Sequence, residues 1–266
     1  MSTSDEDKLR LGGMALRNGL LVHGPTSWAA ACRRRDGTIG TASGHKPRVR
    51  VLDGVPGARG IVRLAEGIAV LPLAKRALPE VRLPWQDAKV LGAVAGATLG
   101  GSLLRRRVRG VGGEVALAAL SMLPSIVALR GGDLAAYHGV EHKAIAAYEQ
   151  DAADARDAAK EHDRCGSHLM APMIASNVAG AALLQRIVER PGPLHGAAVS
   201  LASVGIAIEV FAWAERHDGS RATRVLRTPG HELQRLLGTR EPTEEQLEVG
   251  RAALAEVLRA EGSAQR

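Results

Sequence analysis

A short run at residues 138–142, His-Gly-Val-Glu-His, has the residue types and the spacing of a metal site. On a helix, His138 and His142 lie one turn apart on the same face, so both imidazoles can reach one ion. Glu141 precedes the second histidine, where it can act as a general base toward water at the ion. The pattern is typical of zinc-dependent hydrolases. It predicts His138 and His142 as metal ligands and Glu141 as a catalytic residue.

A second cluster of metal-binding residue types follows about twenty residues later, in the run HDRCGSH at residues 162–168. A thiolate is a strong soft ligand, and a catalytic zinc needs a third protein ligand beside two histidines. We therefore predict that a divalent metal ion, zinc by its ligand types, is held by His138, His142, Cys165 and His162.

Three further residues are weaker candidates for the same site: Glu149, His168 and Glu209. Glu209 lies in the apolar run IAIEVFA, where an ionisable side chain is costly in lipid and often functional. A side chain that extends from the helix end to the membrane interface explains Glu209 equally well. We predict no other cofactor-binding residues. An alternative for the histidines is that they cap helix ends or face water.

Four apolar segments follow the first sixty residues, at residues 89–104, 115–129, 169–188 and 194–214. None shows the repeating polar face that a helix at the surface of a soluble protein turns toward water. The first two are short for the roughly 20 residues that cross a bilayer, so buried helices of a soluble α-domain are the alternative. The pattern favours a polytopic membrane protein that is mainly α-helical.

The remaining segments divide the chain into units. Residues 1–10 are polar and predict a disordered leader, and residues 11–57 predict a small strand-containing segment with a hairpin turn at Asp36-Gly37. Residues 58–214 form the predicted membrane helical domain, which begins with an amphipathic helix at 58–78 and includes the metal-site loop 130–167. Residues 215–266 predict a basic cytosolic tail that ends in an amphipathic helix, with a capping box at its start.

The composition indicates which classes of binding partner the protein favours. The net charge is +7, but the chain has only one Phe, two Tyr and three Trp. Nucleic-acid binding is therefore disfavoured, because single strands are held by basic and aromatic side chains together. Basic loops beside apolar segments favour a lipid bilayer with an anionic surface. We also expect the C-terminal helix to pack on a protein partner. Two cysteines rule out a disulfide framework.

Several stretches together resemble one known family. YHGVEHKAIAAYE and HDRCGSHLM are similar to two signatures of the YqhQ-like bacterial proteins, domain-of-unknown-function family 1385. LGGMALRNGLLVHGPTSWAAACR and TREPTEEQLEVGRAALAEVL resemble the N-terminal and C-terminal stretches of that family. The resemblance runs from about Leu11 to about Leu258. Asn18, His23, Asp163 and Ser167 depart from the family pattern.

The resemblance implies a multi-pass protein of the bacterial cell membrane that is described as a metal-dependent enzyme with an unknown substrate. The matching positions are His138, Glu141, His142 and Lys143 in the first signature, and His162, Arg164, Cys165 and Gly166 in the second. Two main hypotheses follow, and a non-metal role in handling a small molecule or a lipid is the remaining alternative. In the first, the protein is a membrane metal-dependent, hydrolase-like enzyme. In the second, four protein ligands close the site, and the protein is a membrane scaffold with a structural metal and a partner-binding tail.

Overall fold

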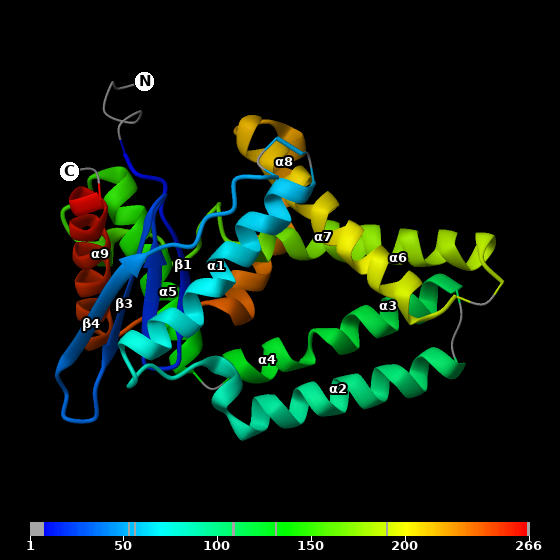
Figure 1. Cartoon of the computed structure of the whole chain (residues 1–266), viewed down its shortest axis with the longest axis horizontal. Helices are drawn as coiled ribbons and strands as arrows, with labels where there is room; N and C mark the ends of the chain where they lie inside the picture. The colour runs from blue at the N-terminus through cyan, green and yellow to red at the C-terminus, as the bar shows by residue number, and fades with distance from the viewer. Residues whose placement is uncertain are drawn as a thin grey trace.

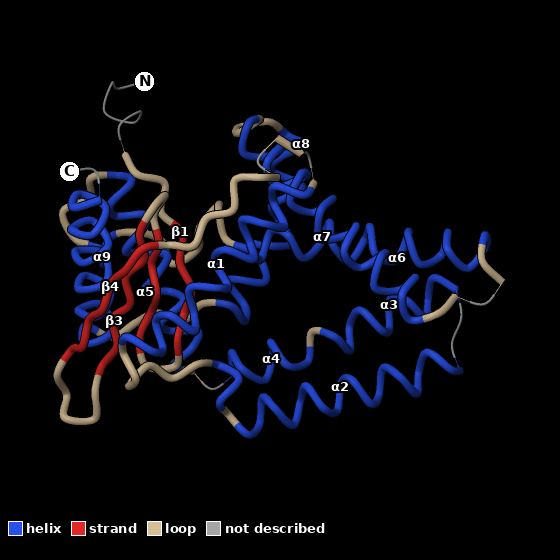
Figure 2. The backbone as a smooth tube through the Cα atoms, viewed as in Figure 1, coloured by secondary structure: helices blue, strands red, loops and turns tan. Residues whose placement is uncertain are grey.

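The computed structural model describes residues 8–52, 54–55, 57–107, 110–130, 132–189 and 191–264. Over these residues the protein consists of a layered head and two long helical arms that project from it in the same direction (Figure 1). The chain is mainly helical, and its strands lie close together near the N-terminus (Figure 2). The prediction of a mainly α-helical chain with an N-terminal strand segment is confirmed.

The head is built on a four-stranded antiparallel sheet. Its strands β1 (Gly12–Leu16), β2 (Gly19–His23), β3 (Ser27–Arg33) and β4 (Ile39–His45) pair in sequence order. The predicted turn at Asp36-Gly37 joins β3 to β4, and Gly37 has a φ of 86°, which glycine adopts without strain. Residues 1–7 of the predicted leader lie outside the described residues, whereas Lys8 donates a hydrogen bond to the Glu149 carbonyl (2.8 Å).

Helices cover both faces of this sheet. Side chains of β2 and β3 alternate between the faces, as the two-residue period of a strand requires. On one face the sheet packs against α5 (Asp133–Gln150) and α9 (Glu244–Ala264), and on the other against α1 (Ala58–Ala77). The first core contains Leu20, Val22, Ala29, Ala31, Val140, Val249, Ala253 and Val257, and the second Leu16, Leu21, Ala30, Cys32, Val70, Leu71 and Ala74. Residues from the beginning, middle and end of the chain therefore form one head.

The C-terminal helix α9 begins at the predicted capping box. The Thr243 N–H donates to Gln246 Oε1 (3.0 Å), and the Gln246 N–H donates to Thr243 Oγ1 (3.4 Å). The apolar side of α9, with Leu247 and Val257 buried, packs on the chain's own sheet and on α5. A protein partner would therefore have to bind the charged outer side of this helix.

The two arms carry the apolar segments. The first joins α2 (Ala88–Arg107) to α3 (Gly110–Ser121) and α4 (Leu123–Arg130), and the second pairs α6 (Met170–Ile187) with α7 (Pro193–Arg216). Three helical stretches are long and apolar enough to cross a membrane: Gly110–Arg130, Gly166–Ile187 and Pro193–Arg216. Four such segments were expected from the sequence, and α2 is not among the three.

Short elements connect the second arm to the head. They are the one-turn helices η2 (Ala155–Asp157) and η3 (Gly166–Leu169), the helix α8 (Arg221–Leu233) and the π-helical turn η4 (Gln234–Gly238). After η4 the chain passes α5 at very close range, and the Arg240 N–H donates to the Ala135 carbonyl (3.0 Å). A Cβ at Gly139 would lie 2.5 Å from the Arg240 carbonyl oxygen, so a glycine is needed at this crossing.

A candidate metal centre between the head and the arms

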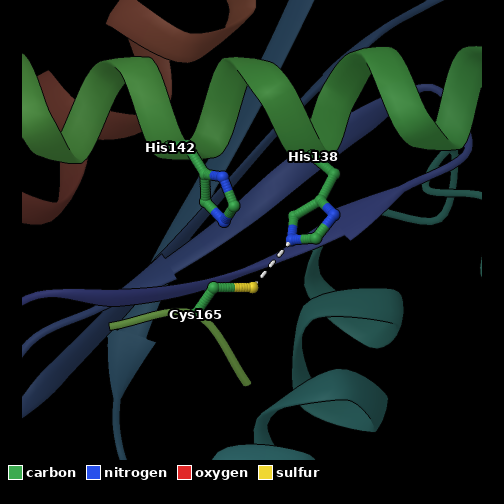
Figure 3. Close-up of side chains that lie close together, drawn as sticks. All are labelled: His138, His142 and Cys165. Atoms are coloured by element: carbon green, nitrogen blue, oxygen red, sulfur yellow. Dashed lines mark hydrogen bonds between the residues drawn. The ribbon is translucent and has the colours of Figure 1, made fainter. Parts of the chain in front are cut away.

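Two histidines of α5 and a cysteine that follows the 151–164 loop converge on one point. His138 and His142 lie on the same side of α5 and point toward Cys165, which precedes η3 (Figure 3). One ligand atom from each of the three side chains lies within 4.8 Å of the other two. His138 Nε2 and Cys165 Sγ are 3.4 Å apart. The structure therefore brings together three of the four predicted metal ligands.

Both imidazoles are oriented by backbone carbonyl groups. His138 Nδ1 lies 2.7 Å from the Gly238 carbonyl oxygen at the end of η4, and His142 Nδ1 lies 2.6 Å from the Lys160 carbonyl oxygen. A carbonyl oxygen can only accept, so in both rings Nδ1 carries a hydrogen and donates it. In the neutral ring this leaves the lone pair on Nε2, which is the tautomer of a metal-bound histidine with a hydrogen-bonded outer nitrogen.

His142 Nε2 is the most informative atom of the cluster. The side chain is 2% exposed, and Nε2 is buried without a hydrogen-bond partner among the described residues. Leaving a buried polar atom unpaired costs about 1–3 kcal/mol. A metal ion beside Cys165 would satisfy this atom, so the side chains present fit the ion that the sequence predicts.

Glu141 lies at the same point. Its Oε2 is 3.9 Å from His138 Nε2 and 3.8 Å from His142 Nε2. Its side chain passes over β1, where a Cβ at Gly13 would lie 2.6 Å from Glu141 Cγ and 2.8 Å from Oε1. The missing side chain of Gly13 therefore makes room for the glutamate.

Burial and neighbouring charges shift the protonation of the cluster in opposite directions. Burial raises the pKa of Glu141, and burial together with the charge of His138 lowers the pKa of His142 to about 3. Burial works against a charged His138, but the hydrogen bond and charge of Cys165 and the charge of Glu141 outweigh it and raise its pKa to about 9. His142 is thus neutral at pH 7 and can offer a lone pair, whereas an ion must displace a proton from His138.

His162 lies beside the cluster but has other partners. Its Nε2 is 3.2 Å from Glu149 Oε2, and its Nδ1 accepts a hydrogen bond from the Arg164 N–H (3.1 Å). Arg164 also pairs with Glu149. The centroids of the His142 and His162 rings are 5.7 Å apart, so His162 lies near the cluster. Its hydrogen bonds nevertheless give His162 and Glu149 the role of holding the segment before Cys165 in place.

Two other residues singled out from the sequence, Glu209 and Lys143, bind partners outside the three-ligand cluster. Glu209 Oε1 accepts from the Gly57 N–H (2.8 Å), and Oε2 pairs with Arg59 Nη2 (3.0 Å). Glu209 therefore caps the start of α1 and lines an apolar groove of about 1000 Å³ between α1 and α7. The Lys143 ammonium donates to the Arg156 and Ala158 carbonyls (2.9 and 2.8 Å) and so fixes the 155–158 loop.

Sequence reasoning missed one buried residue that organises the cysteine segment. Gln234 Oε1 accepts from the His162 N–H (2.8 Å), and its amide donates to the His162 carbonyl (3.1 Å) and to Ser167 Oγ (2.8 Å). The side chain is fully buried and ties η4 to the residues on both sides of Cys165. A single glutamine in an Arg- and Leu-rich helix carries no sequence signal of this role.

Comparisons with known proteins agree with the resemblance seen in the sequence. The profile of the family described as protein of unknown function DUF1385 matches residues 120–260, which is more than half of the chain. The "Uncharacterized protein YqhQ" of Bacillus subtilis (strain 168) is 26% identical over 301 residues, and the match covers 94% of this chain and 92% of the relative. No solved structure matched the chain. The chain belongs to the YqhQ-like family DUF1385.

Proposed function

We propose that this protein is a bacterial integral membrane enzyme of the metal-dependent, hydrolase-like kind, with His138, His142 and Cys165 as ligands and Glu141 as general base. The observation that carries the proposal is the orientation of the two imidazoles. Both donate Nδ1–H to a backbone carbonyl, so both direct Nε2 toward Cys165, and His142 Nε2 is buried without a partner among the described residues. Helix caps or solvent-facing histidines would have no need of this arrangement.

Two nitrogens and one sulfur favour zinc among the common divalent ions. Three protein ligands leave one coordination position open, as in catalytic zinc sites. An ion bound there would act as a Lewis acid and activate water. Glu141 contributes a carboxylate whose Oε2 lies just under 4 Å from both ring nitrogens, within reach of a proton on a molecule at the open position.

The arms support the membrane part of the proposal. In the three candidate spans, only between 6% and 22% of the most apolar window is buried inside the protein, so the rest of each window leaves apolar surface partly or fully exposed. Water would penalise such a surface, whereas lipid would not. Both arms leave the head and return to it (Figure 1), so if both cross, sheet, α5, α8 and α9 lie on one side. We assign this side to the cytosol and place the metal centre at the membrane surface.

The second candidate function is a membrane scaffold with a structural metal. It is favoured by the nearly equal distances from Glu141 Oε2 to the two ring nitrogens (3.9 and 3.8 Å), because a carboxylate there can also close the coordination shell as a fourth ligand. The ion would then tie α5 to the cysteine segment, and the charged outer side of α9 would serve a protein partner.

The two candidates separate in the variant Glu141→Gln. The full chain would be purified in detergent, its bound metal measured by elemental analysis, and the same variant tested for complementation of a deletion strain. An enzyme keeps the metal content of wild type in this variant but fails to complement, whereas a structural site with Glu141 as ligand loses or weakens its ion. Glu161→Gln, which removes a partly buried carboxylate paired with Lys160, is the control. Full complementation by Glu141→Gln would overturn the catalytic role. An absence of metal in wild type, after reloading, would overturn both candidates.

A further inference from the structure

A second group of potential ligands lies on the other side of the cysteine segment. It consists of Asp163, His168 and His231, and one ligand atom from each lies within 4.8 Å of the other two. The group shares no residue with the candidate centre of His138, His142 and Cys165. We propose that it is a second binding site for a divalent transition-metal ion.

The first argument is the chemistry of His168. His168 is 5% exposed, and its Nδ1 is buried without a hydrogen-bond partner among the described residues. Its other nitrogen, Nε2, lies 3.2 Å from the His162 carbonyl oxygen, to which a ring N–H can donate. The Gln234 amide nitrogen also lies 3.2 Å from Nε2, but its two hydrogens have the His162 carbonyl and Ser167 Oγ as acceptors. With Nε2–H donated to the carbonyl, a lone pair is left on the unpaired Nδ1. This arrangement repeats the pattern of His138 and His142, in which one nitrogen is held by the backbone and the other is left for a ligand.

The second argument is that the fold builds the group from two segments and keeps it compact. The His168 ring packs edge-on against the His231 ring, with centroids 4.7 Å apart, and His231 Nε2 lies 2.8 Å from Asp163 Oδ1. A Cβ at Gly230 would lie 2.2 Å from His168 Nδ1, so the glycine in α8 is what allows the two rings to meet. Gln234 holds the residues that directly precede Asp163 and His168, through the His162 carbonyl (3.1 Å) and Ser167 Oγ (2.8 Å).

The ligand set indicates the class of ion and the strength of binding. Two imidazoles and one carboxylate suit borderline ions such as zinc or cobalt, and bonds of about 2.0–2.2 Å require the ligands to close by roughly 1 Å. Arg227 Nη1 lies 3.5 Å from Asp163 Oδ2, and this charge opposes a cation, although Asp218 also engages it at 2.8 Å. The Asp163 side chain is 57% exposed. We therefore expect weaker binding here than at the centre that contains Cys165, with open positions for water.

Cobalt titration of the full chain in detergent, after removal of metal with a chelator, tests the proposal. Only a site with Cys165 gives a thiolate-to-cobalt charge-transfer band in the near ultraviolet, so this band reports the first centre alone. Wild type should bind two equivalents. Asp163→Asn and His231→Ala should each weaken the second equivalent at least tenfold and leave the band unchanged. His45→Ala, which removes an exposed histidine of β4, should still bind two.

The outcomes distinguish this proposal from the proposed function. A single equivalent that gives the charge-transfer band in wild type, or undiminished binding in both Asp163→Asn and His231→Ala, would overturn the second site. Asp163→Asn changes an exposed side chain without changing its size, so a fold defect is not expected to obscure its result. If the charge-transfer band is absent from wild type but one equivalent is lost in both variants, the second site stands and the Cys165 centre fails. Loss of the band in Cys165→Ser with the second equivalent kept would support both.

Discussion

Replacement of His142 by leucine should have opposite energetic consequences with and without metal. Leucine has a similar size and no polar atoms, so it removes the buried Nε2 that lacks a partner among the described residues. This relieves a penalty of about 1–3 kcal/mol, while the lost hydrogen bond to the Lys160 carbonyl costs about 1 kcal/mol. In a chelator the variant should therefore unfold with a free energy within about 2 kcal/mol of wild type, and it can be the more stable of the two.

With metal present, the difference in stability between wild type and His142→Leu should change. An ion at 100 times its dissociation constant stabilises the folded state by about 2.7 kcal/mol. For a chain of this size that corresponds to a rise of roughly 5–10 °C in melting temperature. Wild type should show this rise on addition of zinc, and His142→Leu should lose most of it because one of three ligands is gone.

The assay is thermal unfolding of detergent-purified protein, followed by far-ultraviolet circular dichroism, in chelator and then in excess zinc. His45→Ala controls for the loss of a histidine outside the cluster, since His45 is exposed on β4. An equal zinc-dependent rise in wild type and His142→Leu would refute the reasoning. So would a loss of more than about 3 kcal/mol in chelator, because the histidine would then stabilise the fold without any ion.

Three further predictions concern residues around the site and in the head. Gly13→Ala adds a Cβ 2.6 Å from Glu141 Cγ and should displace the carboxylate by about 1 Å, which can cost about 100-fold in turnover. In a complementation assay this variant should behave like Glu141→Gln. The control Gly166→Ala, with nothing within 4 Å of the new methyl group, should behave like wild type. Gly139→Ala places a Cβ 2.5 Å from the Arg240 carbonyl oxygen and should lower the free energy of unfolding by about 1–3 kcal/mol; a melting temperature equal to that of wild type would contradict this crossing. Burial, together with the charge of Lys46, lowers the pKa of His23 to about 4. Between pH 6.5 and pH 4 the unfolded chain therefore binds one more proton than the folded chain, and the free energy of unfolding should fall by about 2–3 kcal/mol as the pH is lowered through this window. Denaturation at a series of pH values should show a shallower fall in His23→Gln, and equal slopes of stability against pH in the two proteins would argue against a neutral buried His23.

Local sequence signals predicted the elements that depend on neighbours along the chain. The Asp36-Gly37 turn, the capping box at Thr243 and Gln246, and the helical spacing of His138 and His142 are all present in the structure. Each of these depends on residues within four positions of one another, so propensity and side-chain geometry were sufficient. The apolar segments were located in the same way, although hydropathy alone did not separate α2 from the three helices that are apolar enough to cross a membrane.

Residue types and their spacing therefore identify the potential ligands and the helix that carries two of them. The three-dimensional packing of the chain selects which of the distant residues join that helix. Cys165 reaches His138, while His162, three residues earlier, turns to Glu149 because the Arg164 N–H and Gln234 fix its ring and its backbone. The orienting carbonyls of Lys160 and Gly238 and the space above Gly13 arise from backbone positions far apart in the chain. Any residue type provides a carbonyl group, so no sequence pattern marks them.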